Sequence, residues 1–157
     1  PASATWGTLV PRDHMTRCLF FVPASIFNEL CLREERLFMY FEDLDFCLRA
    51  RRAGYKCVYE PGSVIRHRVS RSMGGAYRPL YYYYQTRNLL EVYSVHLGSA
   101  RLSLSAVRLC WHLVVHQSYI MFRAHRFHAG RYLTAIWAGC ADYLSGRLGS
   151  CRHGWIR

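Results

Sequence analysis

Three carboxylates interrupt a strongly apolar stretch between residues 37 and 50, and this feature restricts the fold more than any other. Glu42, Asp43 and Asp45 follow directly on the apolar run at positions 38–41. A carboxylate that leaves water loses several kcal/mol of solvation unless a cation, a hydrogen-bond donor or a proton compensates for it. Acids set among aromatic side chains therefore indicate a candidate site at which the fold supplies such partners.

The same acids also suit the first turn of a helix. Leu44, Cys47 and Leu48 lie on one helical face. The last residues of the segment before Gly54 include three arginines, at positions 49, 51 and 52. Acids at the start of a helix and bases at its end interact favourably with its dipole. On this stretch alone, helix capping is the commoner explanation and a chemical site is the alternative. Asp45 is expected to cap the helix or to pair with a base.

The charge balance favours a phosphate-bearing partner. The 157 residues include 21 Lys and Arg against 10 Asp and Glu, which gives a formal net charge of +11, and Lys56 is the only lysine. Guanidinium groups bind phosphates in a bidentate manner, so a nucleotide, an anionic lipid, polyprenyl phosphate or a nucleic acid would fit this composition. A solvated basic face, or a compositional preference for arginine, would fit it equally.

The seven cysteines favour packed thiols over a metal site. They include no Cys-x-x-Cys pair and follow no regular spacing, so the sequence predicts no zinc site. Several lie within apolar runs, which is typical of reduced cysteines in a cytosolic protein.

Local patterns predict a mixture of strands and helices. Strands are expected at 18–22, 55–59 and 63–69, with a turn at Pro61-Gly62. Helices are expected from Ile26 with Ser25 as its cap, from the acids at 42 and 43 to the arginines before Gly54, from Tyr81 towards Gly98, and from Arg131 to Leu144 with an end at Gly146. A basic amphipathic segment after residue 100 would pack on the domain or lie on an anionic membrane face, and packing is the commoner outcome. The residues from 147 to 157 are expected to be loose.

Several motifs, taken in order, resemble one enzyme family. They are the acidic run 38–45, the segment 48–56 with its Ala-Gly-Tyr-Lys end, then Pro61, His67 and Ser72, and a Tyr-Tyr-x-x-Arg-Asn sequence that ends at Asn88. Together they resemble the C-terminal half of family 2 inverting glycosyltransferases, and rhamnosyltransferase-like members look most similar. The resemblance covers residues 15–97 best.

The resemblance implies an α/β fold, namely the C-terminal part of a GT-A-type nucleotide-diphospho-sugar transferase followed by C-terminal helices. Residues 1–97 would form the C-terminal half of the catalytic domain. Residues 98–146 would form a helical extension and residues 147–157 a basic tail. The sequence has no glycine-rich strand-to-helix turn of the kind that holds a nucleotide diphosphate, and its only Asp-x-Asp pattern is Asp43-Leu44-Asp45 within the acidic run. The chain is therefore expected to lack the nucleotide-binding half and, alone, not to transfer sugar.

The activity implied by the resemblance is a hexosyltransferase-like reaction. A sugar, of which rhamnose is the family's suggestion, would pass with inversion from a nucleotide-diphosphate donor to the hydroxyl of a glycan or lipid-linked acceptor. The product would belong to cell-surface polysaccharide or glycolipid synthesis. The expected location is the cytoplasm, with peripheral contact at the anionic inner face of the plasma membrane.

The resemblance also implies roles for the acids and for one histidine. Asp43 would be the general base that takes the proton of the acceptor hydroxyl, and Glu42 would orient it. His67 would hold a divalent metal, Mg²⁺ or Mn²⁺, on the donor diphosphate. From the residues alone, a histidine among apolar neighbours is more often a hydrogen-bonded core residue.

Four further residues are expected to bind substrate. Arg71 and Ser72 lie in a glycine-bearing segment that resembles a loop closing over the donor; an ordinary surface loop is the alternative. Arg87 and Asn88 end the Tyr-Tyr-x-x-Arg-Asn motif, and the arginine is suited to pairing with a phosphate. The tyrosines before them, at helical spacing, are more typical of packing.

Two rival functions are compatible with the sequence. A basic module rich in arginine and aromatic residues could bind nucleic acid without being an enzyme. The central acidic pair and the lack of a recognisable nucleic-acid-binding motif count against it, so no nucleic-acid partner is expected. The other rival is an inactive remnant of a glycosyltransferase.

Overall fold

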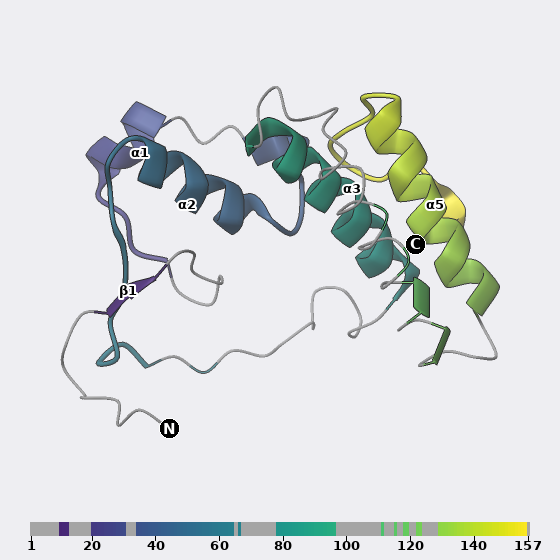
Figure 1. Ribbon diagram of the computed structural model, residues 1–157, viewed down its shortest axis with the longest axis horizontal. Coiled ribbons are helices and arrows are strands. Elements are labelled where there is room, and N and C mark those ends of the chain that lie inside the picture. Colours follow the sequence, from purple (N-terminus) through teal and green to yellow (C-terminus); the bar gives the residue numbers. More distant parts are fainter. Residues whose placement is uncertain are drawn as a thin grey trace. The chain divides into compact units, whose positions relative to one another are not determined.

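The computed structural model describes residues 10–12, 20–30, 34–64, 66, 78–96 and 129–156, together with residues 111, 115, 118, 119, 122 and 123. The chain forms two compact units (Figure 1). The first unit comprises Pro1–Arg33 and Glu42–Arg68, and the second comprises Glu34–Phe41 and Val69–Arg157. The short segment before the acidic pair therefore belongs to a different unit from the pair itself.

The described residues of the first unit form two helices and two short strands. In chain order they are β1 (Val10–Arg12), α1 (Ala24–Leu30), α2 (Glu42–Arg52) and β2 (Cys57–Tyr59). Phe46 of α2 is buried, and its ring lies 5.4 Å from those of Phe20 and Phe27. With the buried Cys47 and Ala50 of α2, these aromatic contacts belong to the described core of the unit.

Helix α2 confirms the helical interpretation of the acidic stretch. It begins at Glu42 with three acids in its first turn and ends at Arg52 with three arginines in its last. Asp45 and Arg49, one turn apart, form an ion pair at 2.7 Å, as expected of an acid that pairs with a base. Gly54 has a φ of 89°, and the amide of Tyr55 bonds back to the carbonyl of Ala50 at 3.0 Å. Such a left-handed glycine is a common helix end.

The strands agree with the sequence only in part. β2 lies inside the predicted strand 55–59 and pairs antiparallel with β1, where the sequence predicted no strand. The predicted turn at Pro61-Gly62 is present, with the amide of Ser63 bonded to the carbonyl of Glu60 at 3.1 Å. Residues 20–22 are not in a strand, and neither are the described residues of the predicted strand 63–69, namely Ser63, Val64 and Arg66.

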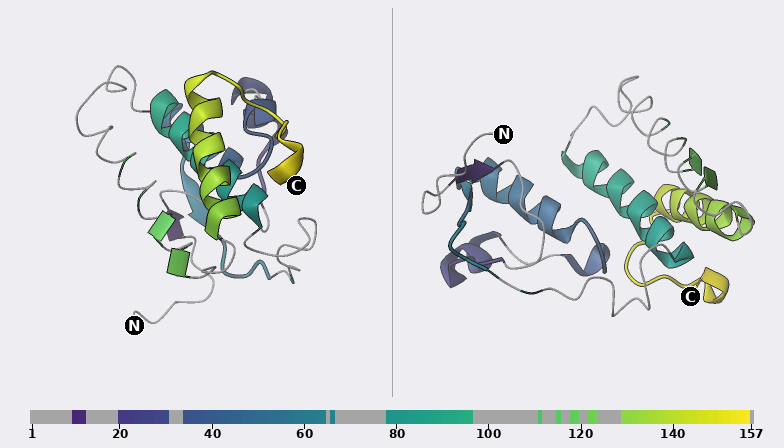
Figure 2. Two further views of the ribbon diagram at one scale, coloured as in Figure 1. Left: turned by 90° about the vertical axis from the view of Figure 1, so that its right-hand side faces the viewer. Right: turned by 90° about the horizontal axis from the view of Figure 1, so that it is seen from below.

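In the part of the second unit that the structure describes, α-helices α3 (Pro79–His96) and α5 (Ala129–Leu144) pack together. This part also contains η1 (Glu34–Arg36) and η3 (Gly154–Ile156). Helices α3 and α5 lie side by side, as Figure 2 shows from two further directions. A buried cluster of five residues joins α3, α5 and the C-terminal segment: Tyr83, Tyr84, Ala135, Cys151 and Ile156.

The two helices approach each other most closely at Gly139 of α5. A Cβ atom placed on Gly139 would lie 2.7 Å from the carbonyl oxygen of Tyr83 and 3.3 Å from the amide nitrogen of Arg87. Ala135, one turn earlier on the same face, is fully buried. Small residues on α5 thus allow its backbone to lie directly against that of α3.

The prediction that residues 147–157 are loose is wrong for the part that the structure describes. Cys151 and Ile156 are buried, and the amide of Cys151 donates to the hydroxyl of Tyr84 at 2.7 Å. The amide of Gly149 also bonds to the carbonyl of Arg36 at 2.6 Å. The charge of this segment suggested solvation, but its apolar residues complete the core beside α3. Helices α3 and α5, on opposite sides of the predicted boundary at residue 97, share one unit.

Among the described residues, no helix combines the length and the apolar character that crossing a membrane requires.

Candidate functional site

The acidic pair stands at the first turn of α2. Glu42 and Asp43 are half-buried, and the amide of Leu44 donates to Oδ1 of Asp43 at 2.8 Å. Asp45 is buried and paired with Arg49, which also donates to the carbonyl of Leu30. Asp43, with its partial exposure, can reach a ligand in solvent, whereas Asp45 serves the packing of α2 and α1.

The backbone directly before the pair has an unusual conformation. Phe38, Tyr40 and Phe41 have φ angles of 63°, 67° and 69°. This left-handed region is sparsely populated by residues other than glycine, because Cβ crowds the backbone there. The ring of Phe38 stacks on Tyr84 with centroids 5.7 Å apart. We call residues 37–41 the entry loop, since it leads the chain into α2.

Asn88 of α3 holds the entry loop by its carbonyl groups. Its side-chain nitrogen lies 2.8 Å from the carbonyl oxygen of Leu37, 2.6 Å from that of Met39 and 3.1 Å from that of Tyr40. The asparagine is fully buried, as is its neighbour Arg87. An amide has two hydrogens to donate, so three converging carbonyls saturate it.

Arg87 directs its donors into the protein. Nη2 donates to the carbonyl of Leu37 at 3.0 Å, Nε to the side-chain oxygen of Asn88 at 2.9 Å, and Nη1 to the hydroxyl of Tyr83 at 3.1 Å. Its guanidinium also lies over the rings of Tyr83 and Tyr84, 5.2 Å and 4.9 Å from their centroids. The sequence assigned Arg87 and Asn88 to substrate; in the structure their donors support the entry loop, and direct contact with substrate stays a prediction.

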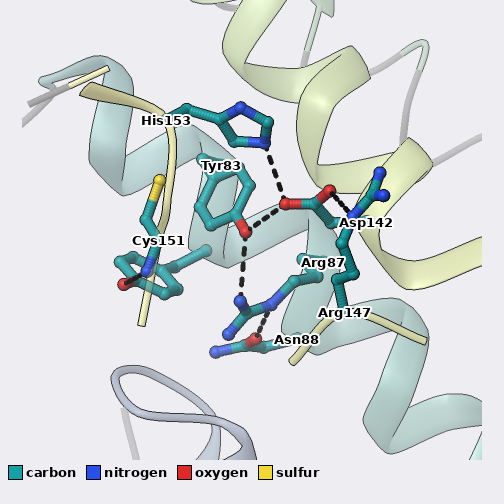
Figure 3. A network of polar contacts seen from close by, with 8 residues as sticks. Tyr83, Arg87, Asn88, Asp142, Arg147, Cys151 and His153 are labelled. Atoms are coloured by element: carbon teal, nitrogen blue, oxygen red, sulfur yellow. Dashed lines mark hydrogen bonds and ion pairs between the residues drawn. The ribbon is translucent and has the colours of Figure 1, made fainter. Parts of the chain in front are cut away.

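A second set of polar side chains continues from Arg87 towards the C-terminus (Figure 3). Asp142 of α5 is buried and accepts three hydrogen bonds, from the Tyr83 hydroxyl at 2.7 Å, from Nε of Arg147 at 2.8 Å and from Nε2 of His153 at 2.9 Å. Burial raises the pKa of Asp142, but the three hydrogen bonds outweigh it and hold the pKa below its ordinary value. Asp142 therefore stays ionised at neutral pH.

Tyr83 stays protonated between these charges. Burial, followed by the hydrogen bond to Asp142, raises its pKa well above the ordinary value of 10.0, although Arg87 acts in the opposite sense. The hydroxyl thus keeps the proton that it donates to Asp142 and offers its oxygen to Arg87.

Three predicted site residues, His67, Arg71 and Ser72, lie outside the described residues. The described part of the chain contains no group of three or more His, Cys, Asp or Glu side chains that could hold a metal ion. The metal expected at His67 stays a prediction.

Sequence reasoning missed the part of the network on α5 and beyond. Tyr83 and Asp142 are 59 residues apart in the sequence, and no local pattern pairs them. One signal was available, because Asp142 is the only Asp or Glu after Glu91. A lone acid in an apolar helix of a basic chain needs a buried partner.

Comparison with known proteins gives no further guide: no protein-family model matches the chain, and neither a curated protein nor a solved structure does.

Proposed function

We propose that this chain is the acceptor-side part of an inverting glycosyltransferase, with Asp43 as its general base. The reaction moves a sugar, with rhamnose as the first candidate, from a nucleotide diphosphate to an acceptor hydroxyl. In this proposal the chain belongs to a GT-A-type α/β fold. The acceptor is a glycan or a lipid-linked glycan, and the enzyme works in the cytoplasm against the inner face of the membrane.

One observation carries the proposal. The apolar segment that opens the acidic run and the Tyr-Tyr-x-x-Arg-Asn sequence, two strong motifs of the resemblance, meet in space, with bonded residues 48 to 51 positions apart in the sequence. Asn88 and Arg87 donate to the carbonyls of Leu37, Met39 and Tyr40 in the entry loop, which ends one residue before Glu42. Two buried polar side chains of α3 that hold a strained loop serve a purpose if the conformation of that loop matters for the acids that follow it in the sequence.

The chemistry required of Asp43 follows from the reaction. An acceptor hydroxyl is a poor nucleophile at neutral pH, so its proton must leave as the oxygen attacks the anomeric carbon. The oxygen forms its bond to that carbon while the bond from the carbon to the diphosphate oxygen breaks. The diphosphate keeps the electron pair of the broken bond, and the carboxylate of Asp43 takes the proton. The amide of Leu44 donates to Oδ1 of Asp43 at 2.8 Å, and the side chain is partly exposed.

The test replaces Asp43 by asparagine in the natural protein that carries this sequence. The amide keeps the shape of the side chain but cannot accept the proton, so turnover should fall by about 10² or more while the Kd of the donor stays unchanged. Transfer is measured with labelled dTDP- and UDP-sugars, and donor binding is measured by calorimetry. The matched control is Glu35→Gln, which removes an exposed carboxylate outside the site. Turnover of the Asp43→Asn protein within threefold of wild type would remove Asp43 from this role.

A further inference from the structure

A continuous chain of buried hydrogen bonds joins α5 to the entry loop. Oδ2 of Asp142 accepts from the hydroxyl of Tyr83, whose oxygen accepts from Nη1 of Arg87. Nη2 of the same guanidinium donates to the carbonyl of Leu37. The direction of every bond is fixed, because arginine can only donate and an ionised carboxylate can only accept. The hydroxyl of Tyr83 is thus the single bridge between the acid on α5 and the arginine on α3 in this chain of bonds.

Asp142, at the α5 end of this series of hydrogen bonds, is held firmly. Arg147 occupies Oδ1 of Asp142, and His153 shares Oδ2 with Tyr83. Since the carboxylate can only accept, Nε2 of His153 carries the hydrogen of that bond. Both basic residues come from the segment after α5, which Cys151 and Ile156 anchor in the core. The orientation of Asp142 is therefore set by contacts on three sides.

The other end of this series of hydrogen bonds is the entry loop, whose backbone conformation needs support from its neighbours. The left-handed residues Phe38, Tyr40 and Phe41 make the entry loop unfavourable as an isolated segment. Arg87 can hold the carbonyl of Leu37 only while its own orientation is fixed. Its Nη1 is fixed by Tyr83, and Tyr83 is fixed by Asp142.

We propose that Asp142 is a positioning residue for the entry loop, on which it acts through Tyr83 and Arg87. Its catalytic consequence rests on the proposed function, whereas the coupling of α5 to the entry loop does not. Asp142 and Tyr83 touch neither donor nor acceptor in this proposal. They keep the entry loop in its left-handed conformation, directly before Glu42 in the sequence.

The first experiment measures hydrogen exchange of the entry loop in the 157-residue chain, at peptides that cover residues 34–41. Tyr83→Phe removes the bridging hydroxyl and keeps the ring. Tyr84→Phe is the matched control, because Tyr84 is equally buried on the same helix and its hydroxyl accepts from the amide of Cys151 instead. We expect several-fold faster exchange of the loop in Tyr83→Phe than in Tyr84→Phe, at a similar loss in Tm.

A second variant tests the same coupling in case the Tyr83→Phe protein does not fold. Asp142→Asn keeps the shape of the acid and removes its charge, so it should also accelerate exchange of the entry loop. The double variant with Tyr83→Phe should exchange no faster than the more affected single variant, because both changes break one chain of bonds. Equal loop exchange in Tyr83→Phe and Tyr84→Phe, or additive effects in the double variant, would overturn the coupling.

The second experiment measures transfer in the natural protein that carries this sequence. Tyr83→Phe should lower kcat about tenfold and leave the KM of the donor unchanged, since a misplacement of ~1 Å can cost about 10²-fold in rate. Tyr84→Phe should leave both constants unchanged. Altered loop exchange with an unaltered kcat would overturn the positioning role. A wild-type protein that transfers no sugar would refute the proposed function, and the exchange experiment would still decide the coupling.

Discussion

The contact between α3 and α5 can be probed by adding one methyl group at Gly139. The new Cβ would lie 2.7 Å from the carbonyl oxygen of Tyr83 and 3.3 Å from the amide nitrogen of Arg87. Both are backbone atoms of α3, which cannot rotate away as the end of a side chain can. The helices must therefore separate by several tenths of an ångström, and overpacking of this kind costs about 1–3 kcal/mol. The rigid neighbours put Gly139→Ala at the upper end of that range.

A favourable contribution offsets part of this cost. Alanine is better than glycine inside a helix by about 1 kcal/mol, so the net loss should be ~2 kcal/mol. In a domain of this size a loss of that magnitude lowers Tm by about 4–8 °C. The melt is followed by the circular dichroism of the helices.

Gly130→Ala is the matched control for Gly139→Ala. Gly130 lies in the first turn of the same helix, and a Cβ placed there meets no atom within 4 Å. Only the helix-propensity contribution acts at this position, so Tm should stay the same or rise slightly. A Gly139→Ala protein as stable as the Gly130→Ala protein would refute the close approach of the two helices.

Two further predictions concern the polar network. Asn88→Ala removes the donor for three carbonyls of the entry loop and should lower the free energy of unfolding by about 1–3 kcal/mol. Gln85→Ala, also on α3, is the control and should lower it by less. Urea titration measures both free energies of unfolding. Asp142 has a pKa below its ordinary value of 3.8, so its stabilising contribution is complete above that pH and is lost as the pH falls through the folded-state value. The free energy of unfolding should therefore decline on acidification below this pH more steeply in wild type than in Asp142→Asn, and parallel pH profiles would contradict the assignment.

Helices α2 and α5 could be predicted from the sequence because their signals are local, whereas the predicted cap Ser25 lies inside α1 (Ala24–Leu30). The acids and arginines of α2 mark its two ends, and Gly54 stops it. The predicted helix from Arg131 to Leu144 differs from α5 only in its first residues, and Gly146 follows it with a φ of 66°. Charge at helix ends and glycine after them need no knowledge of the rest of the fold.

The candidate site could be predicted only in its residue types. The resemblance indicated the acidic pair and also Arg87 and Asn88. It did not predict that Arg87 and Asn88 bind the backbone of the entry loop, which precedes the acidic pair. That relation depends on contacts across about fifty residues and on the left-handed entry loop. Aromatic residues in that conformation violate local preference, so no reading of local propensity finds them. The polar partners on α5 could not be predicted either, because they too depend on contacts between residues far apart in the sequence.

The entry loop also bears on the order in which this unit folds. Three left-handed residues at roughly 1–2 kcal/mol each make its shape too costly to form on its own. The loop must wait until α3 presents Asn88 and Arg87, and so it should be among the last segments to reach its native form. Breaking its contacts with Asn88→Ala should then accelerate unfolding and leave the refolding rate nearly unchanged. In this protein, the backbone that introduces the acidic pair is shaped by residues that are synthesised after it.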